Sequence, residues 1–234
     1  MYLLNFNYSS ANTGVILYIL LIVMIFVSMI VSYKVNSNFR KFSKQAAHSG
    51  LTGREVAKLI LDRNGIYDVN IQPVAGQLTD HYDPRSKTIR LSESVYDESS
   101  ISAISVAAHE VGHAIQDYEH YYFLRFRSAL APIVQFTSSF VTILIFAGLI
   151  LEFWRLFDIG IILYAFSVLF HVITLPVELD ASRRAFNEME INNLITQDEV
   201  RGTKKVLGAA AMTYVASMLI SIIQLARFIN LRRD

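Results

Sequence analysis

The sequence predicts a mainly α-helical integral membrane protein with about four transmembrane helices and one small soluble α+β domain. Hydrophobic residues make up 53% of its 234 residues, which is high for a soluble domain. Four long runs contain no charged residue, and one charged segment rich in turn residues separates the first run from the second. Apolar runs of this length are typical of helices that cross a bilayer.

The four uncharged runs cover residues 14–33, 129–151, 159–177 and 206–226. Each is close to the roughly 20 residues that a helix needs to cross a hydrocarbon core of about 30 Å. We expect the first run to be a retained anchor, because no basic residue precedes it and no small-residue cleavage site clearly follows it. The predicted organisation is therefore a tail and anchor (1–33), a cytoplasmic domain (34–128), a transmembrane hairpin (129–177), a cytoplasmic segment (178–205) and a C-terminal transmembrane or interfacial helix (206–234).

The distribution of Lys and Arg predicts which side of the membrane the soluble parts occupy. Residues 1–13 contain no basic residue, whereas Lys34, Arg40, Lys41 and Lys44 follow the first run. Basic residues also precede the second run and lie between the third and fourth runs, which places all these segments in the cytoplasm. Arg227, Arg232 and Arg233 do not fit, because a fourth crossing puts them outside.

Composition excludes two classes of site. The chain has no cysteine, so neither a disulfide nor a thiolate metal site can form. Its net charge of +1 gives no basic surface of the kind that nucleic-acid binding requires, so we expect no nucleic-acid partner.

The motif His109-Glu110-Val111-Gly112-His113 carries the functional signal. On a helix, two histidines four positions apart lie on one face and can bind a single zinc ion. The glutamate beside the first histidine can then act as the general base toward a zinc-activated water. The flanking residues are apolar, which indicates a buried helix rather than a solvated one.

The sequence of the soluble region predicts further helices and strands. Residues 52–63 fit a helix in which Thr52 and Glu55 form a capping box, and Ser99 or Ser100 is expected to cap the motif helix, which runs to about Tyr118. Residues 69–73 and 88–91 are predicted strands, and residues 82–86 have the composition of a turn. The strand before the motif helix is equally compatible with a substrate-binding edge and with an ordinary strand.

A catalytic zinc ion usually takes three protein ligands, and the motif supplies two. The nearby third histidine found in some zinc peptidases is absent, because positions 116 and 119 are Gln and Glu. We predict Glu178 as the third ligand, since it follows Pro176, where a membrane helix could kink or restart, and a carboxylate is favoured in the first turn of a helix. Asp180, His171 and His120 remain alternatives.

Three further residues are candidates for supporting roles. Asp180 could accept a hydrogen bond from a ligand histidine. Arg183 or Arg184 could stabilise the oxyanion that forms when water attacks a carbonyl group, although both also fit the positive-inside pattern.

Several stretches resemble the putative neutral zinc metallopeptidase family of bacterial membranes (the YugP type). The matching segments are residues 50–53, 78–84, 91–93, 105–116 and 175–185. The resemblance implies a zincin-like (gluzincin) domain in a bacterial cell membrane, and it extends distantly to heat-shock membrane metalloproteases and prenyl-protein endopeptidases. Those families place a glutamate ligand after a membrane hairpin, which supports Glu178. They commonly carry an aspartate four residues later, where this chain has Ser182, so Asp180 is a candidate for that role.

The expected function is a zinc metalloendopeptidase with one zinc ion per chain. Zinc would be held by His109, His113 and Glu178, and Glu110 would act as general base toward a protein or peptide substrate at a cytoplasm-facing site. The alternative is a zinc-bound membrane scaffold or adaptor with vestigial peptidase activity. The intact Glu110 argues against it, because a structural zinc site gains nothing from a base beside a ligand.

Overall fold

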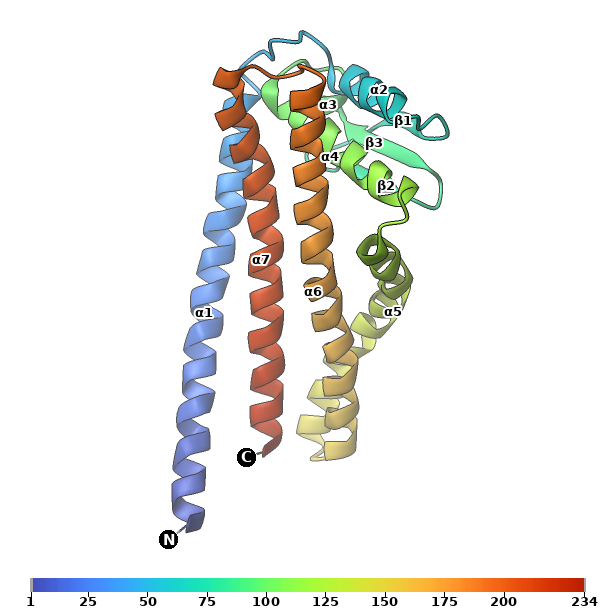
Figure 1. Cartoon of the computed structure of the whole chain (residues 1–234). Helices are drawn as coiled ribbons and strands as arrows, with labels where there is room; N and C mark the ends of the chain where they lie inside the picture. The colour runs from blue at the N-terminus through green and yellow to red at the C-terminus, as the bar shows by residue number, and fades with distance from the viewer. Residues whose placement is uncertain (1, 234) are drawn as a thin grey trace. The chain divides into compact units, whose positions relative to one another are not determined.

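The computed structural model describes the backbone of residues 2–233 and the side chains of residues 12–232. These residues form seven helices and three strands (Figure 1). In chain order they are α1 (Tyr2–Phe42), α2 (Gly53–Arg63), β1 (Asn70–Val74), β2 (His81–Asp83), β3 (Thr88–Ser92), α3 (Glu93–Tyr96), α4 (Ile101–Tyr118), α5 (Tyr122–Ile150), α6 (Trp154–Ile191) and α7 (Gln197–Arg233).

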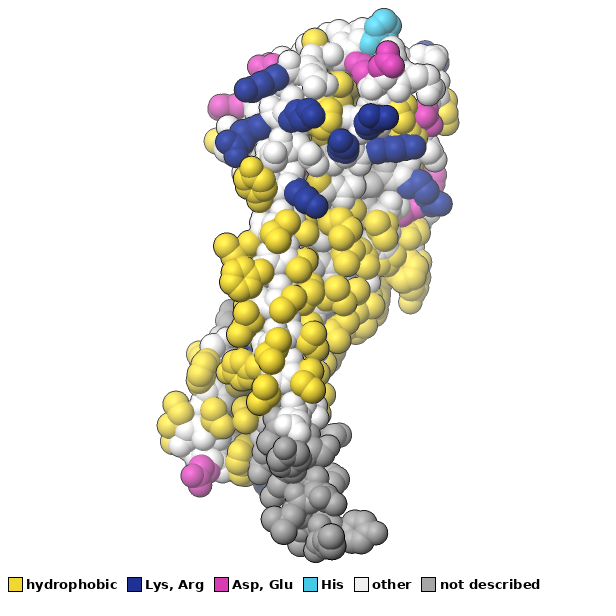
Figure 2. Space-filling model, turned by 90° about the vertical axis from the view of Figure 1, so that its left-hand side faces the viewer, with side chains coloured by type: hydrophobic (Ala, Val, Ile, Leu, Met, Phe, Trp, Pro, Cys, Tyr) yellow, Lys and Arg dark blue, Asp and Glu magenta, His cyan; other side chains and the backbone are white. Residues whose placement is uncertain are grey.

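The predicted fold class is confirmed. Within the described residues, four helices are long and apolar enough to cross a membrane, and they contain the four uncharged runs. The candidate spans are Asn12–Phe42, Tyr122–Ile150, Trp154–Ile191 and Gln197–Arg232. Every one of these helices extends beyond its uncharged run, because residues such as Lys34 and Glu178 continue the helix rather than ending it. On the face shown in Figure 2, hydrophobic side chains cover a large area, and Lys and Arg side chains gather outside that area.

The chain divides into two compact units. One contains the described residues up to Ile30, together with Phe126–Leu175 and residues 213–233. The other contains Val31–Arg125 and Pro176–Met212. The second unit therefore holds the whole sheet, helix α4 and the part of α6 that follows Leu175.

The first unit has a small apolar core around Phe157, which is fully buried against Val141 and Ile145. Gly148 allows the backbone of Phe157 to approach, since a Cβ at Gly148 would lie 2.6 Å from the Phe157 nitrogen. At the end of α7, Arg232 forms an ion pair with Asp158 at 2.7 Å. The C-terminal end of α7 therefore lies beside the beginning of α6.

The second unit contains a mixed three-stranded sheet in the order β1-β3-β2. β3 pairs in parallel with β1 and antiparallel with β2, with Ile89 opposite both Ile71 and Tyr82. The predicted strands at residues 69–73 and 88–91 are present within one residue. The turn predicted at residues 82–86 was placed too early, because Tyr82 and Asp83 belong to β2 and the turn follows them.

The sheet arrangement also decides which strand has a free edge. β3 is the strand nearest the motif helix in sequence, and it is paired on both sides. It therefore cannot accept a further strand, so of the two interpretations left open for it, a substrate-binding edge is excluded and an ordinary strand remains. β1 and β2 are the edge strands.

The local signals for the two predicted soluble helices are confirmed. Thr52 caps α2, its hydroxyl accepts a hydrogen bond from the Glu55 amide, and the Glu55 carboxylate accepts one from the Thr52 amide. Ser100 caps α4 by accepting a hydrogen bond from the amide of Ala103. The apolar faces of both helices join one buried core with β3 and with Ala185 and Met189 of α6.

Helices α4 and α6 approach each other closely at Gly112 and Ala181. A Cβ at Gly112 would lie 2.5 Å from the carbonyl oxygen of Ala181, so only glycine fits there. The α6 segment that makes this contact is a continuous α-helix through Pro176. The predicted restart of the helix at Pro176 does not occur, and the helix-dipole argument for Glu178 is therefore wrong.

This close approach predicts that Gly112→Ala destabilises the protein. The added methyl group must push α4 away from α6, and overpacking of this kind typically costs about 1–3 kcal/mol. The matched control is Gly208→Ala in α7, where a Cβ meets no atom within 4 Å. Alanine there should raise helix stability by about 0.5–1 kcal/mol. Thermal unfolding of the detergent-purified variants measures both effects, and equal stability of the two variants would contradict the account.

Candidate metal centre

Three side chains from two helices converge in the second unit. His109 and His113 lie on one face of α4, and Glu178 lies on α6. The Glu178 Oε2 atom is 3.3 Å from His109 Nε2 and 3.6 Å from His113 Nε2. Within the described part of the chain, these residues form the one group of three His, Asp or Glu side chains whose ligand atoms lie within 4.8 Å of one another.

The spacing of these atoms fits a zinc ion. Zinc binds histidine nitrogen and carboxylate oxygen at about 2.0–2.2 Å, and tetrahedral angles then separate neighbouring ligand atoms by about 3.3–3.5 Å. Both measured distances to Glu178 Oε2 are close to this range. Two imidazoles, one carboxylate and no thiolate form a typical catalytic zinc set that leaves a fourth position for water.

The second nitrogen of each imidazole is also bonded. His109 Nδ1 lies 3.1 Å from the hydroxyl of Ser182, and His113 Nδ1 lies 3.0 Å from the side-chain oxygen of Gln116. An amide oxygen only accepts, so His113 carries its proton on Nδ1 and its Nε2 lone pair is available to a metal. Sequence reasoning did not identify Gln116, although it stands one turn after His113 on the same helix face.

Asp180 contacts neither ligand histidine, contrary to the suggestion that it orients one directly. Its Oδ2 accepts a hydrogen bond at 2.9 Å from the Gln116 amide, which also donates to the carbonyl oxygen of Val177 at 2.8 Å. Asp180 therefore acts on His113 through Gln116. Ser182 itself fills the position where similar families carry an aspartate.

Both candidate arginines point to Asp180 rather than to open space. Arg183 forms an ion pair with Asp180, and Arg184 forms one with Asp180 at 2.5 Å and another with Glu119 at 2.6 Å. The two guanidinium groups thus compensate a mostly buried carboxylate and hold it against Gln116.

Glu110 is buried next to the ligand cluster. The pKa of its carboxyl group is raised to about 7, mainly by burial and also by the nearby carboxylates of Glu178 and Asp80. His109 and a hydrogen bond from the backbone amide of Tyr82 lower the same pKa. A carboxyl group whose pKa lies near neutral can both take up and release a proton.

The edge strand β2 is fastened beside Glu110 by two sets of polar contacts. Asp80 precedes the strand and accepts hydrogen bonds from the backbone amide of Ser92 at 2.7 Å and from its hydroxyl. The Tyr82 hydroxyl donates to Asp117 of α4 at 2.8 Å, and Lys87 forms an ion pair with the same carboxylate. These contacts join the segment 80–87 to both β3 and α4.

The alternative histidine ligands do not join this cluster. His120 follows the end of α4 with a φ of +56°, where its amide donates to the Asp117 carbonyl. His171 bonds through Nδ1 to the carbonyl oxygen of Ser167, one turn earlier in α6, at 2.7 Å. The cluster of ligand atoms contains His109, His113 and Glu178 alone among the described residues.

Comparison with known proteins agrees with these features. A family model described as "Putative neutral zinc metallopeptidase" matches residues 17–233. The "Putative membrane protease YugP" of Bacillus subtilis (strain 168) is 51% identical over 197 residues, which cover 84% of this chain and 88% of that protein. No solved structure matches the chain.

The family match covers most of the chain, including both helices of the metal centre and three of the candidate spans in full. The resemblance noted in the sequence is thereby confirmed. The chain belongs to the family of putative neutral zinc metallopeptidases.

Proposed function

We propose that this protein is a membrane-bound zinc metalloendopeptidase, with one zinc ion per chain held by His109, His113 and Glu178. The convergence of two imidazole nitrogens and one carboxylate oxygen, with Glu110 beside them, carries this conclusion. When bound, zinc lowers the pKa of a water molecule to about 7 and polarises a carbonyl group.

Glu110 acts as the general base in the proposed reaction. Its carboxylate removes a proton from the water whose oxygen attacks the scissile carbonyl carbon. When the carbon–nitrogen bond breaks, Glu110 returns this proton to the departing amine nitrogen. The burial of Glu110 supports this role, because bulk water cannot readily exchange the proton that the carboxyl group carries between the two steps.

The outer edge of β2 is the proposed binding site for an extended substrate. β2 pairs with β3 on one side only, and the backbone amide of Tyr82 interacts with Glu110. This outer edge therefore faces the base. A peptide that pairs with it as an additional strand places its carbonyl groups next to Glu110.

The site is proposed to face the cytoplasm of a bacterial cell. The basic residues after the first span support this orientation under the positive-inside rule. Because Arg232 pairs with Asp158, the C-terminal end of α7 lies near the turn between α5 and α6. This contact supports a complete fourth crossing, in which the C-terminal arginines lie outside.

Glu110→Gln is expected to abolish cleavage of an unstructured protein while zinc content stays unchanged. Glutamine has the same shape but cannot take up the proton, and loss of a general base typically costs about 10²–10⁴-fold in rate. The matched control is Glu190→Gln, an exposed position on α6, which should leave both readouts unchanged. Substantial activity of the Glu110→Gln protein would show that another group serves as base.

Glu178→Gln is expected to release zinc. Loss of a ligand should weaken zinc binding by more than the roughly 10–100-fold that is typical of residues that only support a ligand. Zinc retention after dialysis against a graded series of chelator concentrations measures this change, again with Glu190→Gln as control. Undiminished zinc binding would assign the third ligand to Asp180 or His171 instead.

Two substitutions of Ser182 test how His109 is oriented. Ser182→Ala removes the hydroxyl that faces His109 Nδ1 and should weaken zinc binding about 10–100-fold. Ser182→Asp restores an acceptor, and its carboxylate makes the imidazole a stronger ligand, so zinc binding should equal or exceed that of the wild type. If both variants bind zinc as the wild type does, Ser182 has no role in orienting His109.

A further inference from the structure

A hollow of about 280 Å³ lies in the second unit, between the end of α1 and the first half of α7. Its lining has a basic part, Lys34, Lys204 and Lys205, which we call the rim, and an apolar part, Val31, Ala209 and Met212, which we call the floor. The side chain of Asn38 joins the two helices there by donating a hydrogen bond to the carbonyl oxygen of Lys205 at 3.1 Å. The main lining residues are Val31, Lys34, Lys204, Lys205, Ala209 and Met212.

The positive charge of this hollow is not compensated. No acidic residue lines it, and Lys34 and Lys205 form no ion pair with any described residue. Lys204 is positioned by the aromatic ring of Phe186, whose centroid lies 4.7 Å from the ammonium nitrogen. All three lysines therefore bring a positive charge to the lining of this hollow that no described carboxylate pairs.

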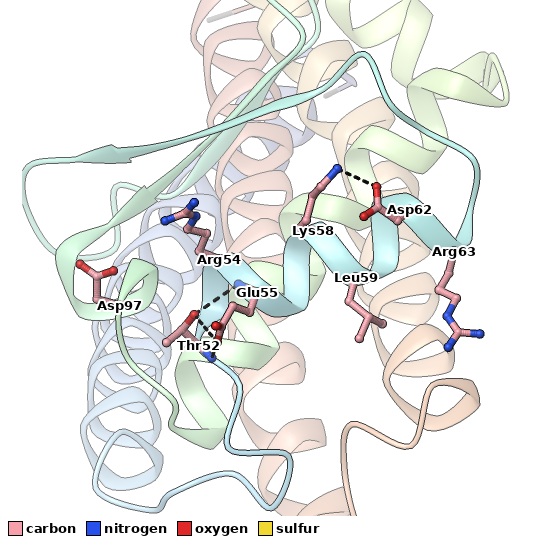
Figure 3. A pocket seen from close by; sticks show the side chains of 8 residues that line it. All are labelled: Thr52, Arg54, Glu55, Lys58, Leu59, Asp62, Arg63 and Asp97. Carbon is pink, nitrogen blue, oxygen red and sulfur yellow. Dashed lines mark hydrogen bonds and ion pairs between the residues drawn. The ribbon is translucent and has the colours of Figure 1, made fainter.

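A second hollow, beside α2, has equal numbers of basic and acidic side chains (Figure 3). It also carries three basic side chains, but Lys58 is paired with Asp62 at 2.7 Å. Its cations are matched in number by acids, so it has no excess of charge. The charged residues of this hollow are Arg54, Lys58, Arg63, Glu55, Asp62 and Asp97.

Gly208 keeps the apolar part of the first hollow open. A Cβ at this position would meet no atom within 4 Å, so packing within the protein does not require glycine. Glycine in the middle of a helix lowers helix stability, and it is favoured where another molecule approaches the backbone closely. This feature is independent of the lysines and leaves room for a bound molecule beside the α7 backbone.

The hollow lies where the uncharged runs of two candidate spans adjoin basic residues. Lys34 directly follows the first uncharged run, and Lys204 and Lys205 directly precede the fourth. A molecule that contacts both the rim and the floor must therefore carry a negative charge at the level of lipid headgroups and an apolar chain at the level of the acyl region. Basic pockets between membrane helices bind anionic lipids in this way.

We propose that this hollow binds one anionic phospholipid. The lysines at positions 34, 204 and 205 contact the headgroup phosphate, and one acyl chain lies over Val31, Ala209 and Met212 along the surface that Gly208 leaves open. Such a lipid bridges α1 and α7, the two helices that Asn38 joins.

The test compares binding of phosphatidylglycerol and phosphatidylcholine to the detergent-purified full chain by native mass spectrometry. A lysine near an anionic lipid surface contributes about a fivefold gain in affinity, so Lys34→Gln/Lys204→Gln/Lys205→Gln should weaken phosphatidylglycerol binding about a hundredfold. The matched control, Arg54→Gln/Lys58→Gln/Arg63→Gln, removes the same charge from the hollow beside α2. It should retain the preference for phosphatidylglycerol, and equal losses in the two triple variants would overturn the proposal.

Gly208→Leu tests the apolar part independently and remains informative if the lysine variant does not fold. Leucine should fill the hollow and weaken phosphatidylglycerol binding at least tenfold without loss of thermal stability. Unchanged binding by Gly208→Leu would overturn the proposal. A further variant, Arg40→Gln/Lys41→Gln/Lys44→Gln, alters a neighbouring basic hollow on α1. If it alone abolishes phosphatidylglycerol binding, the lipid binds there and the proposal is wrong.

Discussion

The candidate metal centre depends on the contact between Gly112 of α4 and Ala181 of α6. Glu178 stands 65 residues after His113, and α5 and the first part of α6 lie between them. The two segments meet because glycine lets the helix backbones approach until the carboxylate of one reaches both imidazoles of the other. Gly112, which stands directly before His113 in the motif, thus has a packing role. A larger residue there would separate the two histidines from Glu178.

The charges around the centre are arranged in layers. The innermost layer is one buried carboxylate and two imidazoles, and neutral groups from Ser182 and Gln116 contact the outer nitrogens of these rings. The carboxylate of Asp180 comes next, and two arginines compensate it. These neutral groups thus add no negative charge to a site that already contains the carboxylates of Glu178 and Glu110.

The sequence predicted those parts of the molecule that rest on local signals. The capping box at Thr52, the cap at Ser100, two strands and the four apolar helices all depend on residues within a few positions of one another. β2 was missed because its three residues are too few to show a periodic pattern and stand beside a turn. The helix break at Pro176 was wrong because packing keeps α6 helical in spite of the hydrogen bond that proline cannot form.

The supporting residues of the site could not be predicted in the same way. Gln116 and Ser182 act through contacts that span 61 and 73 residues of sequence, and no local pattern marks either contact. The available signal for Ser182 was its position four residues after Glu178, where similar families carry an aspartate. Glu178 was predicted correctly as a member of the cluster, but by an incorrect structural argument, because its position follows from helix packing rather than from a helix terminus.

X-ray absorption spectroscopy at the zinc K edge of the purified full chain tests the central claim most directly. A centre assembled by α4 and α6 should show a four-coordinate zinc ion with two imidazole ligands and oxygen donors at about 2.0–2.2 Å. A spectrum with three or more imidazoles would bring His120 or His171 into the centre and would contradict the assignment of Glu178. A six-coordinate shell of oxygen alone would contradict the whole centre.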